Sequence, residues 1–269
     1  MIAIIYEGAK TEKDIFKNIE QCFFRDKETV LVEFIGAPFE GNIYALYKAF
    51  KDNDGNTDII ELVRERLANS KKNALTNKVR DDFSEVYLFF DYDLQHSKDI
   101  KKTNDIVIDM LNTFNNETEA GKLYISYPMV EALKDLKVRN VCSEHCCVCV
   151  KSLTKYKSAV GAVNCFSKAA RYDNDTWRHF CLHAVKKSNC IVKDEYMEPS
   201  FERFINELTG EAIFSGQLAK FVSNYKVAVL SAIPLFLLEY FGEKRWEELL
   251  SCSCSFKSEK SAVCERGCK

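Results

Sequence analysis

Two stretches of sequence decide the expected fold: IAIIYEG at residues 2–8 and VYLFFDYD at residues 86–93. Short unbroken apolar runs of this kind are typical of central strands in a parallel sheet that helices cover on both faces. Each run ends in acidic residues, Glu7 in the first and Asp91 and Asp93 in the second. Because ligand sites of such sheets lie outside the carboxyl ends of the strands, we expect these three acids at a ligand site.

Strand and helix patterns alternate over residues 1–135. We predict strands at 2–6, 29–35, 86–90 and 122–126, and helices at 15–23, 43–50, 58–67 and 106–114. Thr11 is the expected N-cap of the first helix, and Gly36 with residues 38–41 is expected to end the second strand. The alternation predicts an α/β fold with a parallel sheet, right-handed crossovers and flanking helices.

We divide the chain into three segments. We expect residues 1–140 to form an α/β core that carries the acids, and residues 141–225, where strand patterns fade, to form a mainly helical basic insertion or subdomain. Residues 226–269 form a closing core segment and a Cys-rich tail. The apolar run at 227–241 contains a proline and a glutamate and is shorter than the ~20 residues that cross a bilayer, so we expect buried core there.

Composition is that of a globular protein. Of the 269 residues 46% are hydrophobic and 29% are charged, and the net charge of −2 argues against a chain that grips nucleic acid through overall positive charge. Met1 leads directly into an apolar strand pattern without a secretion signal, so we expect a cytoplasmic protein with no membrane segment. Eleven of the 12 cysteines follow residue 141, which argues against a disulfide framework for the whole chain.

The clustered acids suit phosphodiester cleavage. Divalent ions held by carboxylates polarise the phosphoryl group, activate a water and stabilise the leaving oxygen. Without a cation, Glu7, Asp91 and Asp93 would repel one another, so their clustering favours Mg²⁺ or Mn²⁺ binding. The alternative is that Asp-X-Asp is an ordinary turn and Glu-Gly an ordinary loop.

Three motifs in order resemble those of Toprim proteins of the RloB, abortive-infection and PARIS AriB type. They are EGAKTE at residues 7–12, FDYD at 90–93 and SYPMVE at 126–131. The resemblance implies a Toprim fold with Glu7, Asp91 and Asp93 as metal ligands and catalytic acids. It makes Glu12 and Glu131 secondary metal candidates, although Glu131 also suits a helix N-terminus.

The resemblance implies a function as well. Such proteins act as nucleases in antiphage defence, some of them beside an ATPase partner, and this chain carries no Walker A sequence of its own. We therefore expect a toxic, metal-dependent nuclease, with RNA, including tRNA, favoured over DNA, and with homo-oligomers among the expected assemblies. The alternative is a non-catalytic Toprim-like partner or sensor that docks on an ATPase.

The middle of the chain is locally basic. Residues 142–193 contain nine Lys or Arg against three Asp or Glu, a formal charge of +6, interleaved with aromatic residues. This pattern suits phosphate contacts with base stacking. The expected nucleic-acid contacts are Lys155, Lys157, Lys168, Arg171 and Arg178, and the expected stacking residues are Tyr156, Phe166, Tyr172, Trp177 and Phe180. The alternative is a solvated helical surface with its aromatic side chains in the core.

Cysteine and histidine residues cluster in three places. The clusters are Cys142, His145, Cys146, Cys147 and Cys149; His179, Cys181, His183 and Cys190; and Cys252, Cys254, Cys264 and Cys268. Neither of the first two has the paired spacing of a zinc site, so for them we favour buried free cysteines and polar surface histidines over structural zinc. The third offers four potential thiolates, but it lacks apolar periodicity, and a flexible chain end is the alternative there. A cysteine nucleophile ranks low because no cysteine follows a predicted strand in a nucleophile context.

Overall fold

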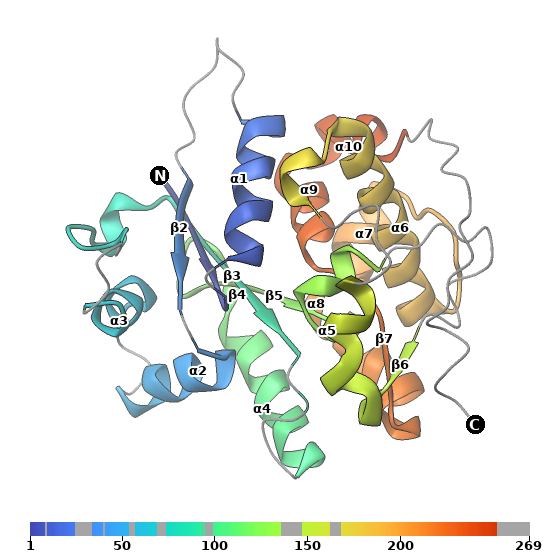
Figure 1. The fold of residues 1–269 in the computed structure, drawn as a ribbon, viewed down its shortest axis with the longest axis horizontal. Coiled ribbons are helices and arrows are strands. Elements are labelled where there is room, and N and C mark those ends of the chain that lie inside the picture. The colour runs from blue at the N-terminus through green and yellow to red at the C-terminus, as the bar shows by residue number, and fades with distance from the viewer. Residues whose placement is uncertain are drawn as a thin grey trace. The chain divides into compact units, whose positions relative to one another are not determined.

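The computed structural model describes residues 1–8, 10–24, 34–39, 41–53, 57–68, 74–92, 94, 99–135, 147–161 and 168–251 (Figure 1). Contacts divide the chain into two compact units, Met1–Tyr124 and Ile125–Lys269. The segments predicted at 141–225 and 226–269 fall in the same unit.

A five-stranded sheet forms the centre of the first unit. Its order is β2-β1-β3-β5-β4, with β1 at Ile2–Tyr6, β2 at Phe34–Pro38, β3 at Glu85–Asp91, β4 at Asn115–Asn116 and β5 at Gly121–Ser126. β1 is parallel to both β2 and β3, whereas β4 is antiparallel to β5. Every residue of β1 is buried, as expected of a central strand. The predicted α/β fold with a mostly parallel sheet flanked by helices is confirmed at this level.

Polar side chains cap the start of three of the four helices described in this unit. The four helices are α1 at Thr11–Phe23, α2 at Ile43–Asp52, α3 at Ile59–Arg66 and α4 at Ile100–Thr113. Asn42, Asp58 and Asp99 each accept a hydrogen bond from a backbone N–H in the first turn of α2, α3 and α4. The predicted Thr11 cap is wrong, because Thr11 is already helical and the N-cap residue, Lys10, makes no side-chain cap.

The second strand also differs from its prediction. β2 continues through Gly36 to Pro38, while residues 29–33 of the predicted strand are not among those described. An edge strand can end in proline because one side of it has no neighbouring strand to receive an N–H. A Cβ at Gly36 would lie 3.0 Å from the Tyr6 hydroxyl, so a larger residue here would push against the Tyr6 side chain.

The second unit is mainly helical. Its elements include η2 at Val130–Leu133, β6 at Cys147–Cys149, η4 at Val150–Ser152, α5 at Leu153–Gly161, η5 at Ala169–Arg171, α6 at Asn174–Lys193, α7 at Phe201–Glu207, α8 at Gly210–Gly216, the π-helix η6 at Gln217–Phe221, η7 at Val222–Asn224, β7 at Lys226–Ala228, α9 at Ile233–Phe241 and α10 at Glu243–Leu250. α6 packs against α9 and α10. In the apolar run at 227–241, every residue from Val227 to Leu238 is buried, and the last three are partly exposed. The predicted buried core is confirmed for this run. None of the helices described is long and apolar enough to cross a bilayer.

Candidate active site

Glu7 and Asp91 meet at the carboxyl ends of two adjacent parallel strands. The Asp91 backbone N–H donates to Oε2 of Glu7 over 3.2 Å, and the Glu7 N–H donates to the carbonyl of Phe89 over 3.2 Å. The register of β1 against β3, which pairs Tyr6 with Phe89, produces this arrangement. Both acids are partly exposed, so a ligand can approach them from solvent.

The residues after Asp91 anchor this strand end to α4. Tyr92 is buried, and its hydroxyl donates a hydrogen bond to Oδ1 of Asn104 over 2.6 Å. Burial, with a smaller contribution from Tyr44, raises the pKa of Tyr92 far above its ordinary value, so the hydroxyl stays protonated and remains a donor. Asp93, the third predicted acid, lies outside the described residues.

Glu12 is engaged with the backbone of the loop that carries Glu7. Its side chain is buried, and Oε1 accepts the Gly8 N–H over 2.9 Å. A Cβ on Gly8 would lie 2.8 Å from Oε2, so a larger residue here would displace the Glu12 carboxylate. Burial first, and the charges of Glu12 and Asp14 next, raise the pKa of Tyr6 to about 12. Glu12, predicted as a secondary metal ligand, thus closes the turn between β1 and α1.

Glu131 belongs to the second unit and pairs with another predicted residue. Its buried carboxylate lies 3.0 Å from the Nζ atom of Lys157, whose own side chain is 70% exposed. A lysine expected to contact nucleic acid therefore neutralises a carboxylate expected to bind metal. Removing Lys157 would leave a buried carboxylate without this ion pair, which is costly.

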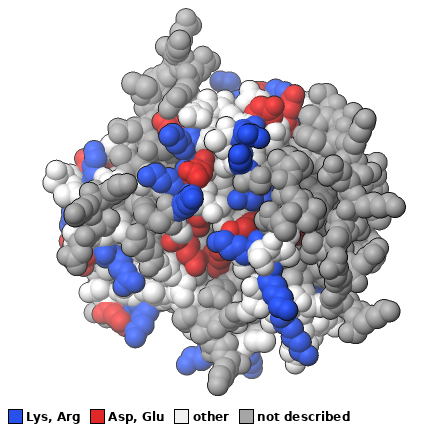
Figure 2. Space-filling model, viewed as in Figure 1, with Lys and Arg blue, Asp and Glu red and all other residues white. Residues whose placement is uncertain are grey.

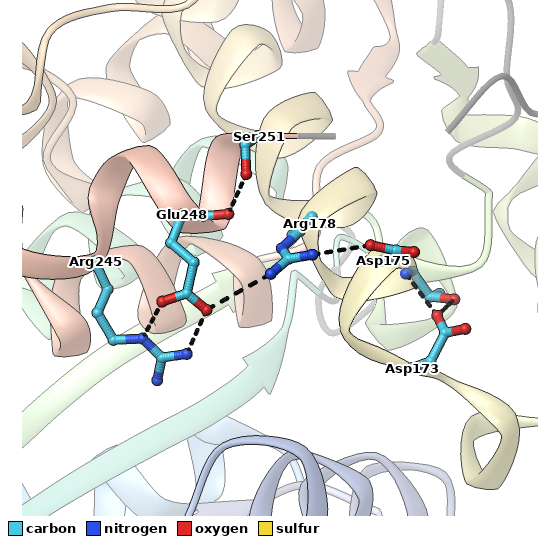
Figure 3. Close-up of polar contacts among 7 residues, drawn as sticks. Asp173, Asp175, Arg178, Arg245, Glu248 and Ser251 are labelled. Carbon is cyan, nitrogen blue, oxygen red and sulfur yellow. Dashed lines mark hydrogen bonds and ion pairs between the residues drawn. The ribbon is translucent and has the colours of Figure 1, made fainter. Parts of the chain in front are cut away.

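The other predicted cations differ in their surroundings. Lys155, Lys168 and Arg171 are exposed. Arg178, in contrast, is held between two carboxylates, 2.9 Å from Asp175 and 3.8 Å from Glu248, as Figure 3 shows. Hydrogen bonds from Arg245, and then the charges of Arg245 and Arg178, lower the pKa of Glu248. Arg178 thus has its charge compensated within α6 and α10.

The prediction that the interleaved aromatic residues stack on bases is wrong for the four that are described. Tyr156, Tyr172, Trp177 and Phe180 are all buried. The last three contact one another edge to face, with ring centroids 5.2–5.8 Å apart. Phe166 is not among the residues described. For these four side chains the core alternative holds, because removing their large apolar surface from water lowers the free energy of the folded state.

The cysteine and histidine clusters lie only partly within the described chain. Cys142, His145, Cys146 and the cysteines after residue 251 fall outside it. Cys181 and Cys190 are buried, and burial raises the pKa of Cys181. The His183 Nδ1 atom lies 2.9 Å from the Tyr196 hydroxyl, and burial first, then Lys186, lowers the pKa of His183 to about 4. Within the described ranges, no three His, Cys, Asp or Glu side chains converge as a metal site would require.

Comparison with known proteins adds no assignment to these residues. No protein-family model matches the chain, and no curated protein or solved structure matches it. The functional argument therefore rests on the residues and their geometry.

Proposed function

We propose that this chain is a divalent-metal-dependent nuclease of Toprim type. The observation that carries the proposal is the hydrogen bond from the Asp91 N–H to the Glu7 carboxylate, which brings two motif acids together at adjacent strand ends. Sites of α/β enzymes occur at this edge of a parallel sheet.

The donor set suits a hard cation. Glu7 and Asp91 offer carboxylate oxygens, which Mg²⁺ and Mn²⁺ prefer, and both are accessible to water. Together with Asp93 they would hold the ion, which when bound polarises the phosphoryl group and lowers the pKa of a bound water. The Glu7 carboxylate, which accepts the Asp91 N–H, would also accept a proton from water.

The biological role that we propose is cleavage of RNA, including tRNA, or of DNA as the toxic effector of an antiphage defence system. Support comes from the three ordered motifs and from the local basic character of residues 142–193. An ATPase partner would supply any dependence on ATP, because the sequence has no Walker A motif.

Purified protein incubated with total RNA and with plasmid DNA, in Mg²⁺, Mn²⁺ or EDTA, tests the proposal. We expect metal-dependent cleavage by the wild type and a loss of about 100-fold or more in Glu7→Gln and Asp91→Asn. Glu7→Gln keeps an oxygen that can accept the Asp91 N–H, so the fold should survive. Because a charge is removed from an acidic cluster, the melting temperature without metal should be unchanged or higher.

Glu65→Gln on α3 is the matched control, because it removes one exposed carboxylate of the same unit. It should cleave like the wild type. Near wild-type cleavage by both site variants would overturn the assignment. A wild-type protein that cleaves nothing in either metal would favour the non-catalytic partner role instead.

A further inference from the structure

Tyr225 is an aromatic residue held in solvent by a strained backbone. Its side chain is 69% exposed, the highest value among the large hydrophobic side chains described as exposed. Its φ of 54° places it in the left-handed region, which costs a residue with a Cβ about 1–2 kcal/mol. Asn or Gly would fill this position with less strain. Neither burial of the side chain nor the backbone conformation therefore explains why this residue is a tyrosine.

The backbone ties Tyr225 to η4, the turn that leads into α5. β6 and β7 are antiparallel, with Cys149 opposite Lys226, and the Val150 N–H donates to the Tyr225 carbonyl over 2.9 Å. The residue after Val150 is the exposed Lys151, and one helical turn further along lies the exposed Lys155. An exposed ring and exposed ammonium groups thus occupy one end of the β6–β7 ribbon.

Charge at this end of the ribbon is of one sign. The described segments 147–161 and 217–230 contain five lysines and no Asp or Glu. Two of these lysines are neutralised, Lys157 by Glu131 and Lys220 by Asp194. Lys151, Lys155 and Lys226 form no ion pair with the described residues. In Figure 2, Lys and Arg side chains gather over the part of this face where Figure 1 places α5.

We infer that Tyr225, Lys151, Lys155 and Lys226 form a binding surface for single-stranded nucleic acid. The tyrosine ring offers a face on which an unpaired base stacks, and the three ammonium groups contact the flanking phosphates. A duplex hides the faces of its bases, so it cannot use the ring. This inference rests on the proposed function for its biological meaning, because it names the substrate class of that nuclease as unpaired.

Binding without cleavage tests the ring. In EDTA, the anisotropy of a fluorescein-labelled oligouridylate and of an RNA duplex of equal length is measured with wild type, Tyr225→Phe and Tyr225→Asn. We expect Tyr225→Phe to bind the oligouridylate like the wild type and Tyr225→Asn to bind it about 5- to 150-fold more weakly. Duplex binding should not change. Since Asn tolerates a positive φ, Tyr225→Asn should melt at the same or a higher temperature, which separates lost binding from lost folding.

A matched pair of triple variants tests the lysines. Lys151→Gln, Lys155→Gln and Lys226→Gln together should flatten the salt dependence of oligouridylate binding, lowering the slope by up to about 2. The control combines Lys193→Gln, Lys220→Gln and Lys244→Gln, which remove three charges from the same unit. Lys193 and Lys220 already pair with Glu207 and Asp194, so we expect little change.

The inference fails if Tyr225→Asn binds oligouridylate like the wild type, if both triple variants lose affinity equally, or if the wild type binds no oligonucleotide. Cleavage measured separately with Mg²⁺ distinguishes this failure from failure of the proposed function. Tight binding of oligouridylate through Tyr225 with no cleavage would support the binding surface and contradict the nuclease proposal. Cleavage by the wild type, with no effect of Tyr225→Asn on binding or on cleavage, would support the nuclease proposal and contradict the binding surface.

Discussion

At the scale of single residues, the loop after β1 shows how one carboxylate positions another. Glu12 binds the Gly8 N–H, Gly8 follows Glu7, and Glu7 binds the N–H of Asp91. The chain of contacts therefore runs from the first turn of α1 to the end of β3. Glu12 acts on the candidate site through the backbone, as a positioning residue.

We expect Glu12→Ala to lower the free energy of unfolding by about 1–3 kcal/mol, because the Gly8 N–H loses its acceptor in a part-buried loop. Glu12→Gln retains an acceptor oxygen and should remain close to the wild type. Urea unfolding of the two variants measures this difference. If Glu12 instead served only as a metal ligand, both variants would unfold like the wild type in EDTA and both would lose metal affinity.

At the scale of elements, the Gln217 side chain makes the two backbone hydrogen bonds to β7 that a neighbouring strand would make. Gln217 is fully buried in the π-helix η6, where its Nε2 donates to the Ala228 carbonyl over 2.8 Å and its Oε1 accepts the Ala228 N–H over 2.9 Å. These two bonds satisfy a buried backbone unit of β7 as a neighbouring strand would. Tyr225 directly precedes β7 in the chain.

Gln217→Ala should therefore lower the free energy of unfolding by about 2–5 kcal/mol, since both the Ala228 N–H and its carbonyl lose these partners in the core. Gln217→Glu keeps the shape but loses a donor and buries a charge, so we expect it to be destabilising too. Thermal unfolding followed by circular dichroism measures both. Little loss of stability in Gln217→Ala would mean that water or rearranged backbone replaces the amide.

At the scale of the whole molecule, the placement of the thiols separates metal-based from cysteine-based chemistry. Cys181 and Cys190 are buried, and the raised pKa of the Cys181 thiol disfavours the reactive thiolate. Both lie on α6 of the second unit. Cleavage by the proposed nuclease should therefore depend on the metal and not on the thiols.

We expect cleavage to survive treatment of the native protein with iodoacetamide and to be abolished by EDTA. Peptide mass mapping should find Cys181 and Cys190 unmodified, whereas the partly exposed Cys22, Cys147 and Cys149 react. Circular dichroism of the alkylated protein controls for unfolding. Loss of cleavage in an alkylated but folded protein, with EDTA harmless, would make a cysteine-based mechanism the leading one.

Local pattern was enough to identify the buried strands predicted at residues 2–6 and 86–90, their alternation with helices, and the acids Glu7 and Asp91 at their ends. These features depend on apolar runs and on the period of side chains along the backbone, which are properties of neighbouring residues. The pairing of Glu7 with Asp91 followed from one further step, because adjacent parallel strands end at the same edge of a sheet.

Contacts between distant residues decided the roles of individual side chains. Helical spacing could not show that Arg178 meets Glu248, or that Lys157 neutralises Glu131, because the partners come from elements far apart in sequence. The aromatic residues of the basic segment carried the same ambiguity, and packing buried the four that are described. Tyr225 lies outside that segment and reaches its lysines only through the pairing of β6 with β7. Tertiary structure decides such cases because burial and charge compensation depend on what lies across the fold, which sequence proximity does not encode.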